Sequence, residues 1–176
     1  MASEHATTSP GTTWGIANEA DWDRVYAEQL PRIYNFFRFR IPNAADAEDL
    51  TARTFEKAWR SRDRYRRDVA AFSTWLFSIA RNVAIDHLRT SREHLPIEAA
   101  DAVALEGTPE SEVSRGSDVA RLAALTADLP ERDRELLALK YGAMMTNRAI
   151  ADLTGLSESN VGTIVSRVVA KLRSRW

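Results

Sequence analysis

The chain has 176 residues, of which 44% are hydrophobic, and a formal net charge of −1. It contains no cysteine, and its three histidines (His5, His87, His94) lack the spacing of metal ligands, so we expect no disulfide, metal or cofactor. No apolar run approaches the roughly 18 residues of a membrane span and the start does not resemble a signal peptide, so we expect a cytoplasmic protein without membrane insertion.

The N-terminal part of the chain predicts helices. Residues 1–20 are rich in Thr, Ser and Gly, and we expect them to be disordered. Apolar residues recur at helical spacing from Asp21 to Arg40, where Pro31 predicts a bend or a restart. A second helix is predicted from Asp46 to Ser61, with acids at its start, and an arginine-rich loop follows at residues 62–70.

A third helix is predicted from Phe72 to Thr90. Its apolar residues cover more than half of the circumference, which is typical of a helix sandwiched between neighbours. Trp75 is interpreted as a core residue rather than a platform for stacking bases. The remaining sector is a polar strip interrupted only by Ile85; it consists of Ser78, Arg81, Asn82 and Arg89. The strip is either a solvated edge or a contact surface for a ligand.

The C-terminal part predicts a second set of helices. Residues 93–117 contain Pro and Gly among acids and alanines, which is typical of a linker. Short helices are predicted at Val119–Thr126 and Glu131–Tyr141, before a helix–turn–helix. The sequence therefore predicts an all-α protein with two small helical domains, residues 21–92 and 118–176, joined by a flexible acidic linker.

The last thirty residues carry the helix–turn–helix pattern. Gly155 suits the left-handed residue of a tight turn, and Ser157 suits the N-cap of the helix that follows. The apolar face of that helix is formed by Val161, Ile164, Val165, Val168 and Leu172. The opposite face presents Ser159, Asn160, Thr163, Ser166 and Arg167. Such side chains can read base edges in a major groove, whereas the plainer interpretation is a solvated surface helix.

Charge alternates along the chain. Residues 60–92 carry eight arginines against three aspartates, 93–118 one arginine against seven acids, and 140–176 six basic residues against two acids. Two positive segments separated by a negative one predict two nucleic-acid contacts joined by a tether that does not bind the duplex.

A series of short motifs occurs in order along both predicted domains. They are Asp46-Ala47-Glu48-Asp49-Leu50, Thr54-Phe55, Ala58-Trp59, Phe72, Trp75-Leu76, Ile79 through Asp86, Leu129-Pro130-Glu131-Arg132 and Ile150-Ala151. In this order the chain resembles the extracytoplasmic-function sigma factors of bacterial RNA polymerase. Such proteins keep the promoter-opening region 2 and the upstream-element reader, region 4.

The resemblance implies roles for three sets of residues. The surface that grips the β′ clamp of core RNA polymerase would contain Asp46, Glu48, Asp49, Leu50 and Phe55. The reader of the single-stranded −10 element would contain Arg64, Arg66, Arg67, Arg81, Asn82 and Arg89. The reader of the −35 element would contain Ser157, Ser159, Asn160, Thr163, Ser166, Arg167 and Lys171. The implied partners are core polymerase (β′ clamp and β), promoter DNA and an anti-sigma factor.

Two departures from the family pattern are notable. Ala52-Arg53 stand where relatives often have Gln-Glu in the clamp-binding helix. Gly162, Ile164 and Val169 fill positions of the recognition helix that are commonly basic. Gly162 either allows a close approach to DNA or accompanies weak upstream binding.

Two other functions are compatible with parts of the sequence. A stand-alone helix–turn–helix regulator would bind duplex DNA by itself and would not associate with polymerase. A hydrolase-like enzyme has almost no support, because the chain lacks cysteine, a glycine-rich loop and a credible Ser/His/Asp arrangement, and we therefore expect no enzymatic activity.

Overall fold

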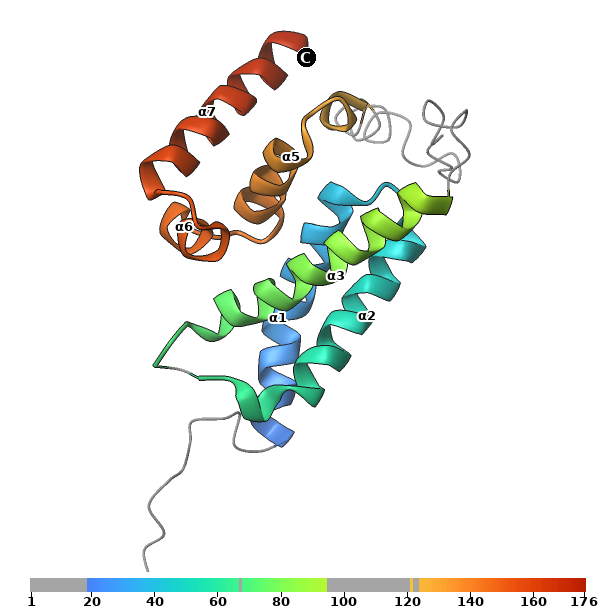
Figure 1. Ribbon diagram of the computed structural model, residues 1–176, viewed down its shortest axis with the longest axis vertical. Helices are drawn as coiled ribbons and strands as arrows, with labels where there is room; N and C mark the ends of the chain where they lie inside the picture. The colour runs from blue at the N-terminus through green and yellow to red at the C-terminus, as the bar shows by residue number, and fades with distance from the viewer. Residues whose placement is uncertain (1–18, 67, 95–120, 122–123) are drawn as a thin grey trace, which may run out of the picture.

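The computed structural model describes residues 19–66, 68–94, 121 and 124–176, and every regular element within them is helical. In chain order these are α1 (Glu19–Arg40), α2 (Ala44–Arg60), the 3-10 turn η1 (Arg62–Arg64), α3 (Phe72–His94), α5 (Glu131–Leu137), the π-helical η2 (Ala138–Gly142), α6 (Asn147–Thr154) and α7 (Glu158–Arg175). Helices α1 to α3 form an N-terminal domain, and α5 to α7 form a C-terminal domain beside it (Figure 1). The predicted all-α class is confirmed. Most of the predicted tail and of the predicted linker lies outside the described residues, and residues 19 and 20 of the tail already belong to α1.

Helix α1 runs through the N-terminal domain as one element, although Pro31 lies inside it. Proline removes a backbone donor and usually kinks a helix, which is why the sequence predicted a bend or restart. Beyond the proline, Ile33, Phe36 and Phe37 are completely buried, so packing keeps this half of the helix in place. Of the two predicted alternatives, the restart does not occur.

Helix α2 is fixed at its start and along its inner face. The side chain of Asn43 caps it by accepting a hydrogen bond from the backbone N–H of Asp46 at 3.1 Å. Further along, Phe55 packs against two aromatic rings of α1, with centroid distances of 6.3 Å to Trp22 and 4.6 Å to Tyr26. Aromatic pairs in such tilted or edge-on arrangements add to the stabilisation from burial.

The C-terminal domain contains the predicted helix–turn–helix. The side chain of Thr146 caps α6 by accepting from the N–H of Ala149. Gly155 ends α6 with a φ of 75°, which glycine adopts without the penalty that a Cβ would bring. The Ser157 hydroxyl then accepts from the N–H of Asn160 at 3.2 Å and caps α7. The buried face of α7 packs against α5 and α6, as its apolar spacing predicted.

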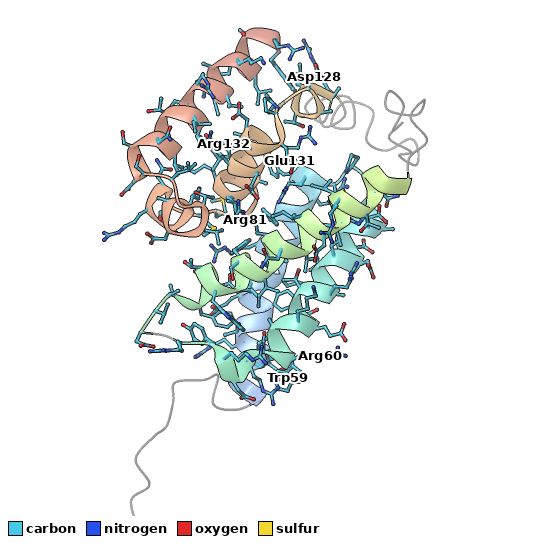
Figure 2. The ribbon with its side chains drawn as sticks, viewed as in Figure 1. Trp59, Arg60, Arg81, Asp128, Glu131 and Arg132 are labelled. Atoms are coloured by element: carbon cyan, nitrogen blue, oxygen red, sulfur yellow. The ribbon has the colours of Figure 1, made fainter. Side chains whose placement is uncertain are left out.

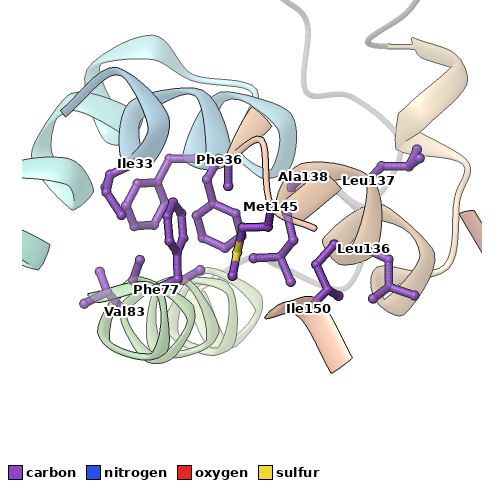
Figure 3. Close-up of a cluster of buried hydrophobic side chains, with 14 of the residues drawn as sticks. Ile33, Phe36, Phe77, Val83, Leu136, Leu137, Ala138, Met145 and Ile150 are labelled. Atoms are coloured by element: carbon purple, nitrogen blue, oxygen red, sulfur yellow. The ribbon is translucent and has the colours of Figure 1, made fainter. Parts of the chain in front are cut away.

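The two domains are packed against each other. A single cluster of buried apolar side chains extends from Ile33 and Phe77 in the N-terminal domain to Leu139 and Ile150 in the C-terminal domain. Figure 3 shows Phe36 and Phe77 next to Met145 and Ala138 in this cluster. The sequence predicted two helical domains but not their contact, because the long acidic segment suggested that they would be separate.

Polar contacts and a close backbone approach complete this contact. We call this polar part of the contact between the domains the domain seam. On the N-terminal side it consists of Arg32, Asn35, Phe39, Arg40 and Arg81, and on the C-terminal side of Glu131, Glu135, Gly142 and Ala143. Arg32 donates from Nε to the carbonyl oxygen of Ala143 at 2.8 Å, and burial lowers the pKa of its guanidinium. A Cβ on Gly142 would lie 2.9 Å from the carbonyl oxygen of Asn35, so only glycine fits there.

Candidate nucleic-acid interface

The polar strip on α3 is open to solvent along most of its length. Asn82 and Arg89 are exposed, Ser78 is half-buried, and Ile85 keeps 43% of its surface accessible. The other faces of α3 are buried, since the helix packs against α1, α2 and α6. The predicted sandwiched helix is therefore confirmed, and the strip is its accessible face.

Arg81 differs from its neighbours on the strip because the C-terminal domain partly covers it. Its guanidinium donates from Nε to Glu135 Oε1 at 2.9 Å and from Nη2 to Oε2 at 3.3 Å. The side chain remains 32% exposed. Figure 2 shows Arg81 at the domain seam, far from Trp59 and Arg60 at the other end of the N-terminal domain. Arg81 is thus on the predicted face, but it is already engaged.

The arginine-rich loop follows α2. Arg64 is exposed at the end of η1, and Arg66 forms an exposed ion pair with Asp68, with Nη2 and Oδ2 2.7 Å apart. The hydrogen bond between them raises the pKa of Arg66 and lowers the pKa of Asp68. Arg67, also predicted as a contact residue, lies outside the described residues.

An aromatic cluster anchors this loop to α3. Tyr65 is buried, and its ring centroid lies 5.3 Å from that of Phe72 and 5.2 Å from that of Trp75. Trp75 is partly buried and packs on the hydrophobic core, as the sequence interpretation expected. The Tyr65 hydroxyl donates to the carbonyl oxygen of Ala70 at 3.2 Å and so ties the two ends of the loop together.

The acids at the start of α2 form an exposed surface. Asp46, Glu48 and Asp49 are all exposed, and the Asp49 side chain is 67% accessible, with only a 3.9 Å contact to Arg53. Leu50 and Phe55, predicted to belong to the same contact surface, are only 1% and 5% exposed. The structure thus differs from the predicted exposed surface at these two positions: both side chains point into the bundle, where they hold α2 in place.

Next to these acids lies an apolar groove that the sequence analysis did not identify. It runs between α1 and α2 and is lined by Tyr26, Leu30, Pro31, Tyr34, Glu48, Thr51 and Ala52. Tyr26, Leu30 and Tyr34 are among the apolar residues that recur at helical spacing in α1, yet Tyr26 is 40% exposed. An exposed aromatic at the edge of an inner face is the feature that could have indicated the groove.

The outer face of α7 presents all the side chains predicted to read DNA. The exposed residues are Ser157, Ser159, Asn160, Thr163, Ser166, Arg167 and Lys171. Arg167 is 67% exposed and lies 3.6 Å from Asp133 of α5, which leaves its guanidinium free to turn towards a ligand. The Ser157 hydroxyl is already used as the N-cap, so its first role is structural.

The described residues hold no group of three or more His, Asp or Glu side chains suited to a metal ion. None of the described helices is long and apolar enough to cross a membrane.

Comparison with known proteins agrees with this arrangement. Residues 25–94 match the family model of sigma-70 region 2, and residues 120–172 match that of sigma-70 region 4. Two regions of these kinds on one chain define a sigma factor of the sigma-70 class.

The similarity extends to whole proteins. The chain is 31% identical over 160 residues to the ECF RNA polymerase sigma factor BldN of Streptomyces coelicolor, covering 89% of this chain and 61% of BldN. It is 30% identical over 146 residues to the RNA polymerase sigma-H factor of Pseudomonas aeruginosa, covering 77% of this chain and 69% of that protein. The chain belongs to the extracytoplasmic-function RNA polymerase sigma factors.

A solved structure shares the fold. The sigma factor RpoE of Bartonella quintana, in complex with the anti-sigma factor NepR, superposes with a TM-score of 0.69 at 24% identity, covering 88% of this chain and 95% of RpoE.

Proposed function

We propose that this chain binds core RNA polymerase through α2 and directs it to promoters that the strip on α3 and the outer face of α7 read. The single observation that carries this proposal is the presence of two separate exposed faces, one suited to unpaired bases and one to a major groove. As a polymerase subunit it would act in the cytoplasm, without catalytic chemistry of its own.

The −10 strand would bind along the α3 strip and the arginine-rich loop. The exposed amide of Asn82 can both donate to and accept from the Watson–Crick edge of an unpaired base. Arg64 and Arg66 would hold the phosphates of the same strand. The ion pair of Arg66 with Asp68 is fully exposed, and such pairs are weak enough for a phosphate to displace the carboxylate.

The −35 element would bind the outer face of α7. Ser159, Asn160 and Thr163 are short side chains on the first turns of the helix, where recognition helices contact base edges. The guanidinium of Arg167 can donate two parallel hydrogen bonds to the O6 and N7 atoms of a guanine. Lys171 lies one turn further along the helix, where it would contact the phosphates.

Core polymerase would bind the acidic start of α2 and the groove beside it. An apolar groove bordered by exposed carboxylates is suited to a helical partner with basic flanks, because the apolar part supplies affinity and the charges supply orientation. Since Leu50 and Phe55 are buried, the contact would depend on Asp46, Glu48, Asp49 and the lining residues of the groove.

An anti-sigma factor would control this contact. RpoE of Bartonella quintana, which has the same fold, is solved in complex with the anti-sigma factor NepR. We infer control of the same kind here, since a partner covering the groove between α1 and α2 would exclude core polymerase.

Size-exclusion chromatography with purified core polymerase tests the first step. The wild-type chain should co-elute with core, and Asp49→Ala should weaken the complex about tenfold, equivalent to about 1.4 kcal/mol. Asp152→Ala, which removes the same charge from an exposed site on α6, is the matched control and should bind normally. A stand-alone regulator would instead bind duplex DNA tightly by itself and would not co-elute with core.

A further inference from the structure

One carboxylate at the domain seam engages two arginines of the other domain. Glu135 of α5 is 8% exposed and accepts from Arg81 at 2.9 and 3.3 Å and from Arg40 Nη1 at 3.2 Å. Arg40 also contacts Glu131, and only 2% of its side chain is accessible. The C-terminal domain therefore binds the N-terminal domain through a buried charge cluster.

The position of Arg81 gives this cluster a consequence for DNA binding. Arg81 belongs to the same strip as Asn82, and a guanidinium that binds a carboxylate through two parallel hydrogen bonds can bind a phosphate in the same way. We propose that Glu135 is an intramolecular competitor of promoter DNA: it occupies Arg81 while the domains are docked, so docking and −10 binding exclude each other. The proposal rests on the function proposed above, because Arg81 must belong to the DNA-binding strip.

Two sites in the seam allow the docked arrangement to be weakened without altering the buried apolar cluster. Arg40 is buried and Glu135 is one of its two carboxylate partners, so neutralising Glu135 removes part of the compensation of a buried charge and should penalise the docked arrangement. Gly142 lies against the backbone of Asn35, where a methyl group would push the domains apart. Glu135 and Gly142 are chemically unrelated, but a change at either one acts on the same equilibrium between docked and open domains.

A competing ion pair and a permanent structural ion pair predict different effects on the affinity for DNA. If the docked form outnumbers the open form by about ten to one, the apparent affinity for DNA is about tenfold below that of the open form. Variants that undock the domains would then bind DNA more tightly although no contact with DNA has been added. In a permanent ion pair, the same variants would lose stability without gaining affinity.

The experiment measures the separation of the domains and the binding of DNA on the same full-length chain. Because the chain has no cysteine, Lys57→Cys and Ser174→Cys introduce one fluorophore site on an exposed face of each domain. Glu135→Gln and Gly142→Ala are the test variants. Asp128→Asn, which removes the same charge from an exposed pair with Arg175 inside the C-terminal domain, is the matched control. The probe is a random-sequence single-stranded DNA of twenty nucleotides.

We expect both test variants to show lower energy transfer and about tenfold tighter DNA binding, while Asp128→Asn matches the wild type. Saturating DNA should also lower energy transfer in the wild-type chain. DNA binding without any change in transfer, or undocked variants that gain no affinity, would overturn the competition. Transcription with core polymerase distinguishes a failure of the competition from a failure of the proposed function. If the wild-type chain and the variants still initiate transcription, the proposed function stands and only the competition fails. If the wild-type chain does not initiate transcription, both proposals are overturned.

Discussion

The side chain of Asn147 at the start of α6 lies against Gly162 near the start of α7. A Cβ on Gly162 would come within 3.2 Å of Asn147 Nδ2, and Asn147 Oδ1 is buried without a hydrogen-bond partner among the described residues. The glycine therefore accommodates a neighbour inside the helix–turn–helix. The sequence explained Gly162 either by a close approach to DNA or by weak upstream binding, and neither explanation included this contact between α6 and α7.

Gly162→Ala should raise the free energy of unfolding by about 0.5 to 1 kcal/mol, because alanine is the better helix former and only the end of a flexible side chain has to move. Urea denaturation measures the change. Gly155→Ala is the contrasting variant and should lose about 1 to 2 kcal/mol, since its φ of 75° is strained for any residue with a Cβ. A loss of stability in Gly162→Ala would show that Asn147 cannot shift.

Asn82→Ala should reduce the formation of open promoter complexes about tenfold or more, since losing a base contact costs about 1 to 3 kcal/mol. Its affinity for core polymerase should not change, because α2 is untouched. Permanganate footprinting of unpaired thymines measures the open complex. Thr90→Ala on the same helix is the control, since its hydroxyl bonds to Asp86 within α3. Normal opening by Asn82→Ala would remove this residue from base reading.

Arg167→Ala should weaken binding of duplex DNA at the upstream element by about 1 to 3 kcal/mol if the guanidinium reads a base. The exposed ion pair with Asp133 holds it only loosely, so little folding stability should be lost. Fluorescence anisotropy of the polymerase-bound chain on upstream duplexes gives the affinity. Arg175→Ala removes the same charge two turns later and is the comparison. Equal effects of both changes would mean that Arg167 contributes charge alone.

Phe77→Ala should destabilise the protein by about 3 to 5 kcal/mol, the usual cost of removing a buried aromatic ring. Phe77 is fully buried, packs edge-on against Phe36 with centroids 5.8 Å apart, and lies under the Arg32 guanidinium. Urea denaturation followed by circular dichroism measures the loss. Ile85→Ala, at an exposed position on the same helix, should stay within about 0.5 kcal/mol of the wild type.

The helical faces could be predicted from the sequence because they depend on local spacing. Four of the five apolar residues predicted for the inner face of α7 are buried, Leu172 is half-buried, and the polar residues of the opposite face are exposed. Ser157 and Gly155 also occupy the cap and the turn that their chemistry favours. Leu50 and Phe55 show the limit of a family motif: it marks residues that matter without separating exposed side chains from buried ones that position the helix.

The domain seam could not be predicted, because it depends on contacts between residues that are 54 to 111 positions apart. Nothing near Arg40 in the sequence indicates that its charge is neutralised by Glu131 and Glu135. The fit of Gly142 against Asn35 likewise appears only once both helices are placed. An isolated glycine at the end of a helical segment is equally typical of an ordinary helix end.

Transcription in vitro from fragments of the genomic DNA, with purified core polymerase and the full-length chain, tests the central claim most directly. Sequencing the 5′ ends of the RNA should give a discrete set of start sites that core alone does not produce, preceded by shared −10 and −35 elements. RNA ends that are the same with and without this chain would contradict its role in promoter selection.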